Sequence, residues 1–600
     1  MLFEFQKSPS TKLSVDNVRL APTDVLFEIR SWVVAVDAPI SRDRTALLEA
    51  SANQLVASLD RGAAAIDRPM YESFFGGHFA ALAFNRDNGD VYVLRDVVGA
   101  KTIFISERPD GVVIGTNTHE VMSCAPTRGL SKNSIRTLMV LDHFLDGETF
   151  YADIREMPMG SLHRIAPEGS LESVLRFDLD LAVVENTFDF STNVAHLREK
   201  IIQAHADRAG AENIVLLSGG IDSSVMLCAL RETVEASRLR AMTFRVKGTR
   251  QDETEYAKQM ADELGVSIEL VEIDPNDERL FADFDTEILK MNNPYFGRFI
   301  FGNFQGTPDQ VYFAGQDTRL HTPDLNGVDR LAFALFGLQQ YSIPSAVSKG
   351  LAHILSSLTK PQGTYSSASR SRRGMYRAAM TLDTDRYLPR FFFNLDLQQL
   401  SEQGLTDATI QKVSGEVELD WRAATNQRQL YNMIVAKKWG SQYTDDMRYL
   451  QDLGHLNNTH VALPFYDISL ARFSSTLPMK QAASFMSGRA NFGTQRSVIN
   501  KIMLRQAFKE QLPEALYLRA KAVSNSQYLL FAGVIGRIVR GILQEDAARG
   551  AKSIALALGL EPLVARFHAL TTYRPEDEVF LTRIYWLATI IRIGGKHHLF

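Results

Sequence analysis

The chain has 600 residues, of which 45% are hydrophobic and 22% charged, and this length predicts more than one hydrophobic core. A formal net charge of -5 and a pI near 6.3 give no basic footprint for nucleic acid, which favours small molecules or peptides as partners. The two cysteines, Cys124 and Cys228, predict neither a disulfide framework nor a zinc site and fit a reducing cytoplasm, and the start of the chain lacks the pattern of a signal peptide.

Short apolar runs separated by turn residues predict a strand-rich first domain over residues 1–180. Examples of these runs are VYVLRDVVGA, KTIFIS and GVVIGTN. A helical pattern, SKNSIRTLMVLDHFLDG, follows them. This pattern predicts one mixed domain of strands and helices.

Residues 190–600 change to an alternation of helix, strand and glycine turn, which predicts βαβ units and a parallel sheet covered by helices. A segment at about 340–414 sets lysines and arginines among serines and is interpreted as a basic insertion, either a solvated loop or a binding surface. The apolar stretch 579–593 contains Arg583 and Arg592, so a helix against a core is predicted there, and no membrane span is expected.

The sequence IVLLSGGIDSSVMLCAL, from Ile214 to Leu230, is the most informative of the chain. It predicts a buried strand, a tight glycine turn and a helix, which together aim backbone N–H groups and the positive helix end at one point. A phosphate or pyrophosphate suits that point. The residues expected to bind it are Ser218, Gly219, Gly220, Asp222, Ser223 and Ser224.

This turn is not a Walker sequence, because no Gly-Lys-Ser/Thr follows it. Asp222 falls in the first helical turn, where a carboxylate is either a favourable helix-start charge or a ligand of a magnesium ion that separates it from the phosphates. Magnesium is the sharper interpretation.

The SGGxDS sequence resembles the pyrophosphate loop of a family that cleaves ATP between its α and β phosphates and makes adenylates. The order of elements that follows resembles asparagine synthetases: a strand, RAMTFRV, an acidic pair that opens the helix ETEYAKQMADELG, and a third strand, VSIELVEI. The resemblance implies an α/β chain: an inactive Ntn-type αββα amidotransferase-like sandwich, then an adenine-nucleotide alpha-hydrolase-like parallel sheet with helices. It also implies that Thr243 and Phe244 border the adenine of ATP.

In that family a later strand ends in a turn whose aspartate holds Mg2+. The corresponding stretch VYFAGQDTRLHTPD gives that role to Asp317, although an aspartate in a surface turn is the alternative. The family has glutamate or tyrosine three residues earlier, where this chain has Ala314.

Two segments near the C-terminus also resemble the family. One of them, KIMLRQAFKEQLPEALYLRAKAVSN, contains Lys521 at the position where relatives keep a lysine near the phosphates. VALPFYDISLARFSSTLP follows His460, which replaces a glutamate of relatives; a histidine with a pKa near neutrality is a candidate base for the attacking amine.

The segment GHFAALAFNRDNGDVYVLRDVVGAKTIFIS resembles the glutamine amidotransferase domain of the same family, including Arg95-Asp96 and the Gly99–Lys101 pattern. That activity needs an N-terminal cysteine nucleophile, but this chain has Leu2 after Met1. Glutamine hydrolysis is therefore excluded, and the acceptor amine is expected on the substrate itself.

Within the family, the resemblance favours the lasso peptide cyclases. It implies that Mg-ATP adenylates an Asp or Glu side chain of a core peptide, and that the peptide's N-terminal amine then closes a macrolactam ring. Such enzymes act in the cytoplasm with a leader-peptide-binding protein and a leader peptidase. An ammonia-dependent asparagine synthetase, a β-lactam synthetase and a non-catalytic scaffold remain alternatives.

Overall fold

The computed structural model contains strands and helices in both halves of the part of the chain that it describes, and the predicted α/β class is confirmed. The structure describes residues 1–7, 13–40, 44–124, 129–145, 147–166, 169–182, 184–249, 253–282, 284–288, 291–292, 306–315, 318, 321–323, 347, 350, 353–354, 357, 423–489, 496–520, 527–574 and 577–597. Most of the segment 340–414 lies outside these ranges, so its interpretation stays a prediction.

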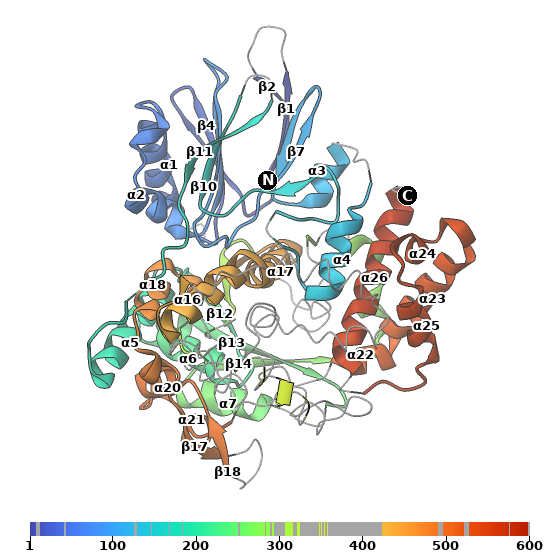
Figure 1. The fold of residues 1–600 in the computed structure, drawn as a ribbon. Coiled ribbons are helices and arrows are strands. Elements are labelled where there is room, and N and C mark those ends of the chain that lie inside the picture. The colour runs from blue at the N-terminus through green and yellow to red at the C-terminus, as the bar shows by residue number, and fades with distance from the viewer. Residues whose placement is uncertain are drawn as a thin grey trace.

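The first part of the chain forms two antiparallel sheets. One has the order β2-β1-β8-β7-β9 and the other β11-β10-β6-β5-β4-β3. Helices α1 and α2 lie beside one sheet, and α3 and α4 beside the other, giving four layers (Figure 1). The elements are β1 (Leu2–Lys7), β2 (Leu13–Arg19), β3 (Val25–Ile29), β4 (Trp32–Asp37), α1 (Thr45–Leu59), α2 (Arg68–Ser73), β5 (Ala80–Asn85), β6 (Val91–Arg95), β7 (Phe104–Arg108), β8 (Gly111–Gly115), α3 (Thr118–Cys124), α4 (Lys132–Leu141), β9 (Arg155–Glu156), β10 (Ser161–Ile165) and β11 (Leu171–Arg176).

The sandwich follows from strands that are apolar on both faces. Phe3 and Phe5 of β1 lie in the core between the sheets, whereas Leu2 belongs to the cluster that includes α3 and α4. Successive side chains of a strand point to opposite faces, so one strand serves two cores. This is the αββα arrangement expected from the sequence.

The second part is built around a parallel sheet with the order β14-β13-β12-β15-β16. Its strands and flanking helices are α5 (Phe190–Ala206), β12 (Glu212–Leu216), α6 (Ile221–Arg231), β13 (Leu239–Val246), α7 (Thr254–Glu263), β14 (Ser267–Ile273), α8 (Phe284–Glu287), β15 (Gln310–Phe313), α16 (Gln427–Lys438), α17 (Thr444–Leu456), β16 (His460–Ala462), α18 (Ile468–Ser475), α19 (Met479–Ala482), β17 (Met486–Arg489), β18 (Arg496–Ile499), α20 (Ile502–Ala507) and α21 (Glu514–Tyr517). The sandwich strands end at Arg176 and α5 begins at Phe190, while the division into 1–180 and 190–600 stays a prediction.

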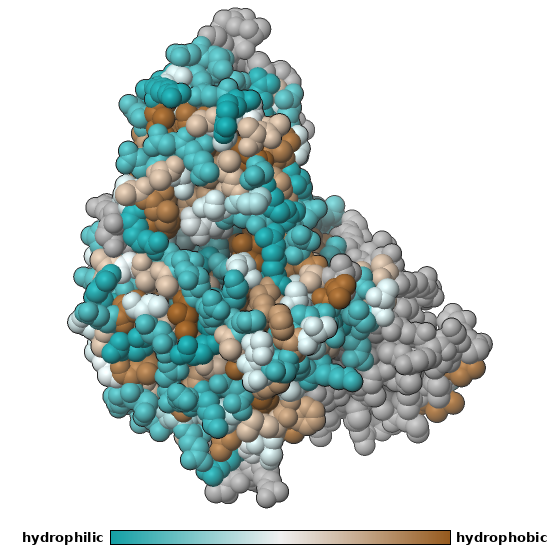
Figure 2. Space-filling view, turned by 90° about the vertical axis from the view of Figure 1, so that its left-hand side faces the viewer, coloured by the Kyte–Doolittle hydropathy of each residue, from teal (hydrophilic) through white to brown (hydrophobic). Residues whose placement is uncertain are grey.

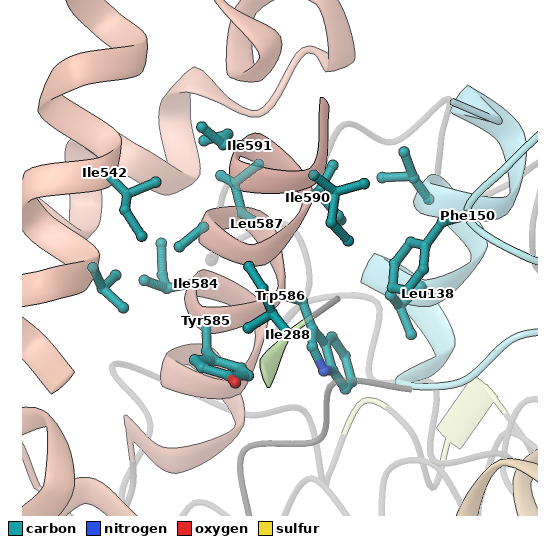
Figure 3. Packing of buried hydrophobic residues seen from close by; sticks show 14 of the residues in the cluster. Leu138, Phe150, Ile288, Ile542, Ile584, Tyr585, Trp586, Leu587, Ile590 and Ile591 are labelled. Carbon is teal, nitrogen blue, oxygen red and sulfur yellow. The ribbon is translucent and has the colours of Figure 1, made fainter. Parts of the chain in front are cut away.

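The last helices join the two parts through one hydrophobic cluster. Trp586 and Leu587 belong to one cluster with Leu138 of α4 and Phe150 from the first part and with Ile542 of the last helices (Figure 3). These helices are α22 (Gln527–Ala532), α23 (Val534–Ala548), α24 (Ile554–Leu558), α25 (Glu561–Ala569) and α26 (Glu578–His597).

The prediction that 579–593 faces a core is confirmed, because α26 packs into this cluster. The buried Arg583 does not contradict it: its guanidinium donates to the Met139 carbonyl at 2.6 Å and pairs with Asp142 at 2.7 Å. No helix among the described residues is long and apolar enough to cross a bilayer. On the face shown in Figure 2, hydrophobic residues are scattered among hydrophilic ones.

A buried ion-pair network also joins the two parts. Arg448 of α17 pairs with Glu156 of β9 and, at 2.5 Å, with Asp445. The second Glu156 oxygen lies 2.7 Å from the Arg95 guanidinium. No side chain of the four is more than 5% exposed. Burial raises the pKa of Asp445 to about 6, against the lowering effect of Arg448.

Candidate functional site

The predicted strand, turn and helix at the phosphate loop are present. Strand β12 ends at Leu216 and α6 begins at Ile221, with Gly220 as its N-cap. The neighbours of β12 are β13 on one side and β15 on the other, so the strand order reverses at β12. Ligands of open α/β sheets bind outside the carboxyl ends of the strands at such a reversal, where the loop 217–220 lies.

Gly219 is required by both backbone conformation and space. Its φ is +74°, and a Cβ atom there would lie 2.5 Å from the Glu253 carbonyl oxygen and 3.1 Å from the Ala257 nitrogen. The loop therefore packs directly on the start of α7, and only a glycine allows this approach.

Gly219→Ala is expected to weaken ATP binding at least about tenfold, because the added methyl displaces the loop from α7 and the left-handed backbone disfavours alanine. Isothermal titration calorimetry with a non-hydrolysable ATP analogue measures the change. Gly265→Ala is the matched control, since Gly265 has a φ of +64° but a methyl group added there would meet no atom within 4 Å. Equal affinity of the Gly219 variant and the parent protein would contradict the assignment of the loop.

The serines of the loop mainly shape it. The Ser223 hydroxyl accepts from the Ser218 nitrogen at 3.2 Å and donates to the Gly220 carbonyl at 3.2 Å. The Ser224 hydroxyl donates to the same carbonyl at 2.8 Å. The Ser218 hydroxyl accepts a hydrogen bond from the Gly220 nitrogen at 3.3 Å. The three hydroxyls expected as phosphate donors thus hold the turn, and backbone N–H groups are left as the principal donors.

Asp222 already binds a cation of the protein itself. The Lys501 ammonium lies 2.7 Å from its Oδ1 and 2.6 Å from its Oδ2. The Thr318 hydroxyl donates to Asp222 Oδ1 at 2.6 Å and accepts from Lys501 at 2.8 Å. Three segments distant in sequence therefore meet at the first turn of α6.

A second cation, Arg519, contacts the loop at Gly219. It donates to the Gly219 carbonyl at 2.5 Å, pairs with the Glu253 carboxylate and covers the Tyr256 ring at 4.1 Å. Burial lowers the pKa of Arg519 to about 10, so it stays charged at neutral pH. Neither Lys501 nor Arg519 is predicted from the sequence, although both lie in the segment quoted for Lys521.

Thr243 and Phe244 lie beside the loop. The Leu217 nitrogen donates to the Met242 carbonyl at 2.8 Å, and β13 then continues through Thr243 and Phe244 past the end of β12. Thr243 is buried and Phe244 partly buried. The structure brings both residues to the carboxyl edge of the sheet.

Asp317 and Lys521 lie outside the described residues, so their roles stay predictions. The segment around Asp317 approaches the loop at two described points. A Cβ on Gly315 would lie 3.4 Å from the Ser223 Cα, and Thr318 bonds Asp222. Ala314 is buried, and its nitrogen donates to the Ala462 carbonyl at 3.1 Å, so β16 extends beside it.

His460 is not brought to the loop. It is the first residue of β16 and pairs with Val311 near the start of β15, so it lies toward the amino-terminal edge of the sheet. Burial and then the nearby Lys101 lower the pKa of His460 to about 4, and Asp37 and His455 also act on it. The expected pKa near neutrality is corrected accordingly, and we do not retain His460 in the site.

The described residues fit a nucleotide with magnesium. Helix α6 presents N–H groups to an anion, and the position of the Lys501 ammonium shows that the Asp222 carboxylate binds a cation there with both oxygens. Among the described residues no group of three or more histidine, cysteine or acidic side chains is arranged to hold a metal ion. Magnesium at nucleotide sites is held by one or two carboxylates together with substrate phosphates.

Residues 195–292 match the family model of asparagine synthase. This segment runs from α5 through the loop, α6, β13, α7 and β14. The sequence resemblance is thus supported over the segment that contains the loop, whereas Thr318, Lys501 and Arg519 lie outside the match. No curated protein matches the chain.

Solved structures give weak matches. A glutamine-dependent NAD+ synthetase from Acinetobacter baumannii in complex with adenosine diphosphate is 17% identical, covers 48% of this chain and 59% of its own, and has a TM-score of 0.18. The allosteric regulatory enzyme of purine biosynthesis is 13% identical, with 43% and 63% covered and a TM-score of 0.17. Glutamine phosphoribosylpyrophosphate amidotransferase from B. subtilis, complexed with ADP and GMP, is 13% identical, with 45% and 59% covered and a TM-score of 0.17. The chain spans less than two thirds of each.

Proposed function

We propose that this chain is an ATP-dependent amide ligase that forms an acyl-adenylate, releases pyrophosphate and passes the acyl group to an amine. The observation that carries the proposal is the loop 217–220 with two buried cations around it, Lys501 and Arg519. The match of residues 195–292 to the asparagine synthase model supports the same class.

The chemistry follows from the charges at the loop. Backbone N–H groups at the start of α6 bind the two phosphates that leave, and the positive helix end favours their charge. Lys501 supplies a further positive charge beside Asp222. Charge that grows on the leaving pyrophosphate is stabilised by donors already in place, which is worth about 10²- to 10³-fold in rate for a single donor. Bound magnesium would neutralise phosphate charge and be held by Asp222 and Asp317. Lys521 is proposed near the phosphates, where its ammonium would stabilise the charge that grows on the leaving pyrophosphate and on the oxyanion.

The substrate proposed for this site is a peptide that carries both the carboxylate and the amine. A glutaminase of the N-terminal cysteine type would need a thiol at the start of β1, but Leu2 there is fully buried in the core. The two cysteines of the chain are at positions 124 and 228, in α3 and α6. An amine on the substrate makes the attack intramolecular, and positioning of both groups contributes up to ~7–11 kcal/mol.

The finer proposal is a lasso peptide cyclase that joins a core peptide's N-terminal amine to an Asp or Glu side chain. It acts with a leader-peptide-binding protein and a leader peptidase. The resemblance of the sequence supports this choice of substrate, together with Leu2 at the position where the amidotransferases that it resembles carry their cysteine nucleophile.

Product analysis tests the proposal. With Mg-ATP and a leader-free precursor peptide from a neighbouring gene, we expect AMP, pyrophosphate and a peptide that has lost one water. ADP as the product would overturn activation through an acyl-adenylate. Asparagine formed from aspartate, ammonia and ATP, or a β-lactam from a small amino acid, would overturn the peptide substrate alone. Absence of pyrophosphate release with every carboxylate tried would favour a non-catalytic scaffold.

A further inference from the structure

Lys501 occupies an unusual position for a lysine. Its side chain is 5% exposed, and its backbone adopts φ +59° at the N-cap of α20. Lysine is among the residues least often buried, and left-handed backbone is uncommon outside glycine, asparagine and aspartate. The neighbouring Arg505 fixes this junction, because its guanidinium donates to the carbonyls of Asn500, Leu516 and Tyr517 at 2.6–3.0 Å. The fold therefore holds the lysine at Asp222 in spite of a conformational cost.

The Lys501 ammonium also occupies the position at Asp222 that a metal ion would take. It lies within 2.7 Å of both Asp222 oxygens, and the Thr318 hydroxyl bonds the ammonium and the carboxylate together. A divalent cation ligated by Asp222 has to displace this ammonium or lie beside it, and two positive charges at contact distance repel strongly in a buried site.

We propose that Lys501 is the resting counter-ion of Asp222 and makes binding of a divalent cation at Asp222 depend on the nucleotide. The idea rests on the proposed nucleotide site. A bare divalent cation gains the carboxylate but leaves the ammonium without an anionic partner, with the Thr318 hydroxyl as an uncharged acceptor. A nucleotide that brings its own phosphates gives the ammonium a new anionic partner, so the carboxylate is released to the metal. Nucleotide and metal therefore bind with positive coupling.

Manganese titration of the nucleotide-free protein, followed by the electron paramagnetic resonance signal of free Mn2+, tests this proposal. Lys501→Met and Lys501→Gln are expected to bind Mn2+ about tenfold or more tightly than the parent protein. Glutamine keeps a hydrogen-bond donor at Asp222 and serves if the methionine variant does not fold. Lys501→Arg, which keeps the charge, is expected to match the parent.

Two further variants make the result specific. Lys509→Met removes an exposed lysine of the same segment and is expected to leave the Mn2+ affinity unchanged. Adding Asp222→Asn to Lys501→Gln is expected to abolish the gain. Retention of tight binding in that double variant would overturn the proposal, because the metal would then lie elsewhere.

The coupling gives an independent readout. In the parent protein, Mn2+ is expected to raise the affinity for α,β-methylene-ATP more strongly than in Lys501→Gln. Equal coupling in both proteins, or equal nucleotide-free Mn2+ affinity, overturns the counter-ion role while AMP formation stands. ADP as the reaction product overturns the proposed function while the Mn2+ result stands.

Discussion

Asp222→Asn is expected to slow carboxylate-dependent exchange of labelled pyrophosphate into ATP by about a thousandfold, which corresponds to roughly 4 kcal/mol of transition-state stabilisation. Asparagine has nearly the same shape as aspartate but no charge to hold a metal ion against the phosphates. The exchange assay reports formation of the adenylate directly, so it does not depend on the later attack of the amine.

The same variant removes the counter-ion of a buried lysine. Breaking one partner of a buried pair costs about 3–5 kcal/mol of stability, so thermal unfolding has to be measured beside the exchange rate. The double variant Asp222→Asn with Lys501→Met removes both charges and is expected to recover most of the stability without the activity. Asp262→Asn, on the exposed face of α7, is the control for the substitution itself. An exchange rate of Asp222→Asn within tenfold of the parent would contradict the role of Asp222.

Arg448→Met is expected to lower the free energy of unfolding by about 3–5 kcal/mol, because it leaves the Glu156 and Asp445 carboxylates with one guanidinium fewer in a buried network. Since Arg448 and Glu156 belong to the two different parts of the chain, we expect the loss to separate their unfolding transitions in calorimetry. The parent protein is expected to unfold them together.

Arg30→Met provides the matched control for that loss. Arg30 also pairs with an aspartate, Asp60, at 3.2 Å, but its side chain is 78% exposed. Exposed pairs contribute about 0–1 kcal/mol, so this variant is expected to unfold like the parent. If Arg448→Met were no less stable than Arg30→Met, the network would not be what holds the two parts together.

Local sequence patterns are sufficient to predict the loop 217–220 and the helix α4 of the first part. The run from Ile214 to Leu230 carries a strand, a glycine turn and a helix within one short segment, and the helix pattern after Lys132 has a Ser131 cap whose side chain accepts from the Ser134 nitrogen. Such features depend on neighbours a few residues apart, so the sequence contains nearly all the physics that decides them.

The cations around the loop depend on contacts that no local pattern contains. Lys501 meets Asp222 across 279 positions of the chain, and Arg519 meets Gly219 across 300. The family resemblance includes their segment, but which of its basic side chains reaches the loop depends on how α20 packs against α5 and α6. For His460 the position in the sequence is misleading, because it matches a glutamate of the family. Burial and the nearby Lys101 lower the pKa of His460 below the near-neutral value that a base for the attacking amine requires.

The shared cluster of α4 and α26 has a consequence for biosynthesis. The cluster that contains Leu138 receives Trp586 and Leu587 only after more than four hundred further residues have been made. A nascent sandwich on the ribosome therefore presents an uncovered apolar helix for most of translation, the kind of surface that chaperones bind. Expression of the isolated first part is expected to yield aggregates, and co-expression of a fragment that carries α26 is expected to rescue its solubility.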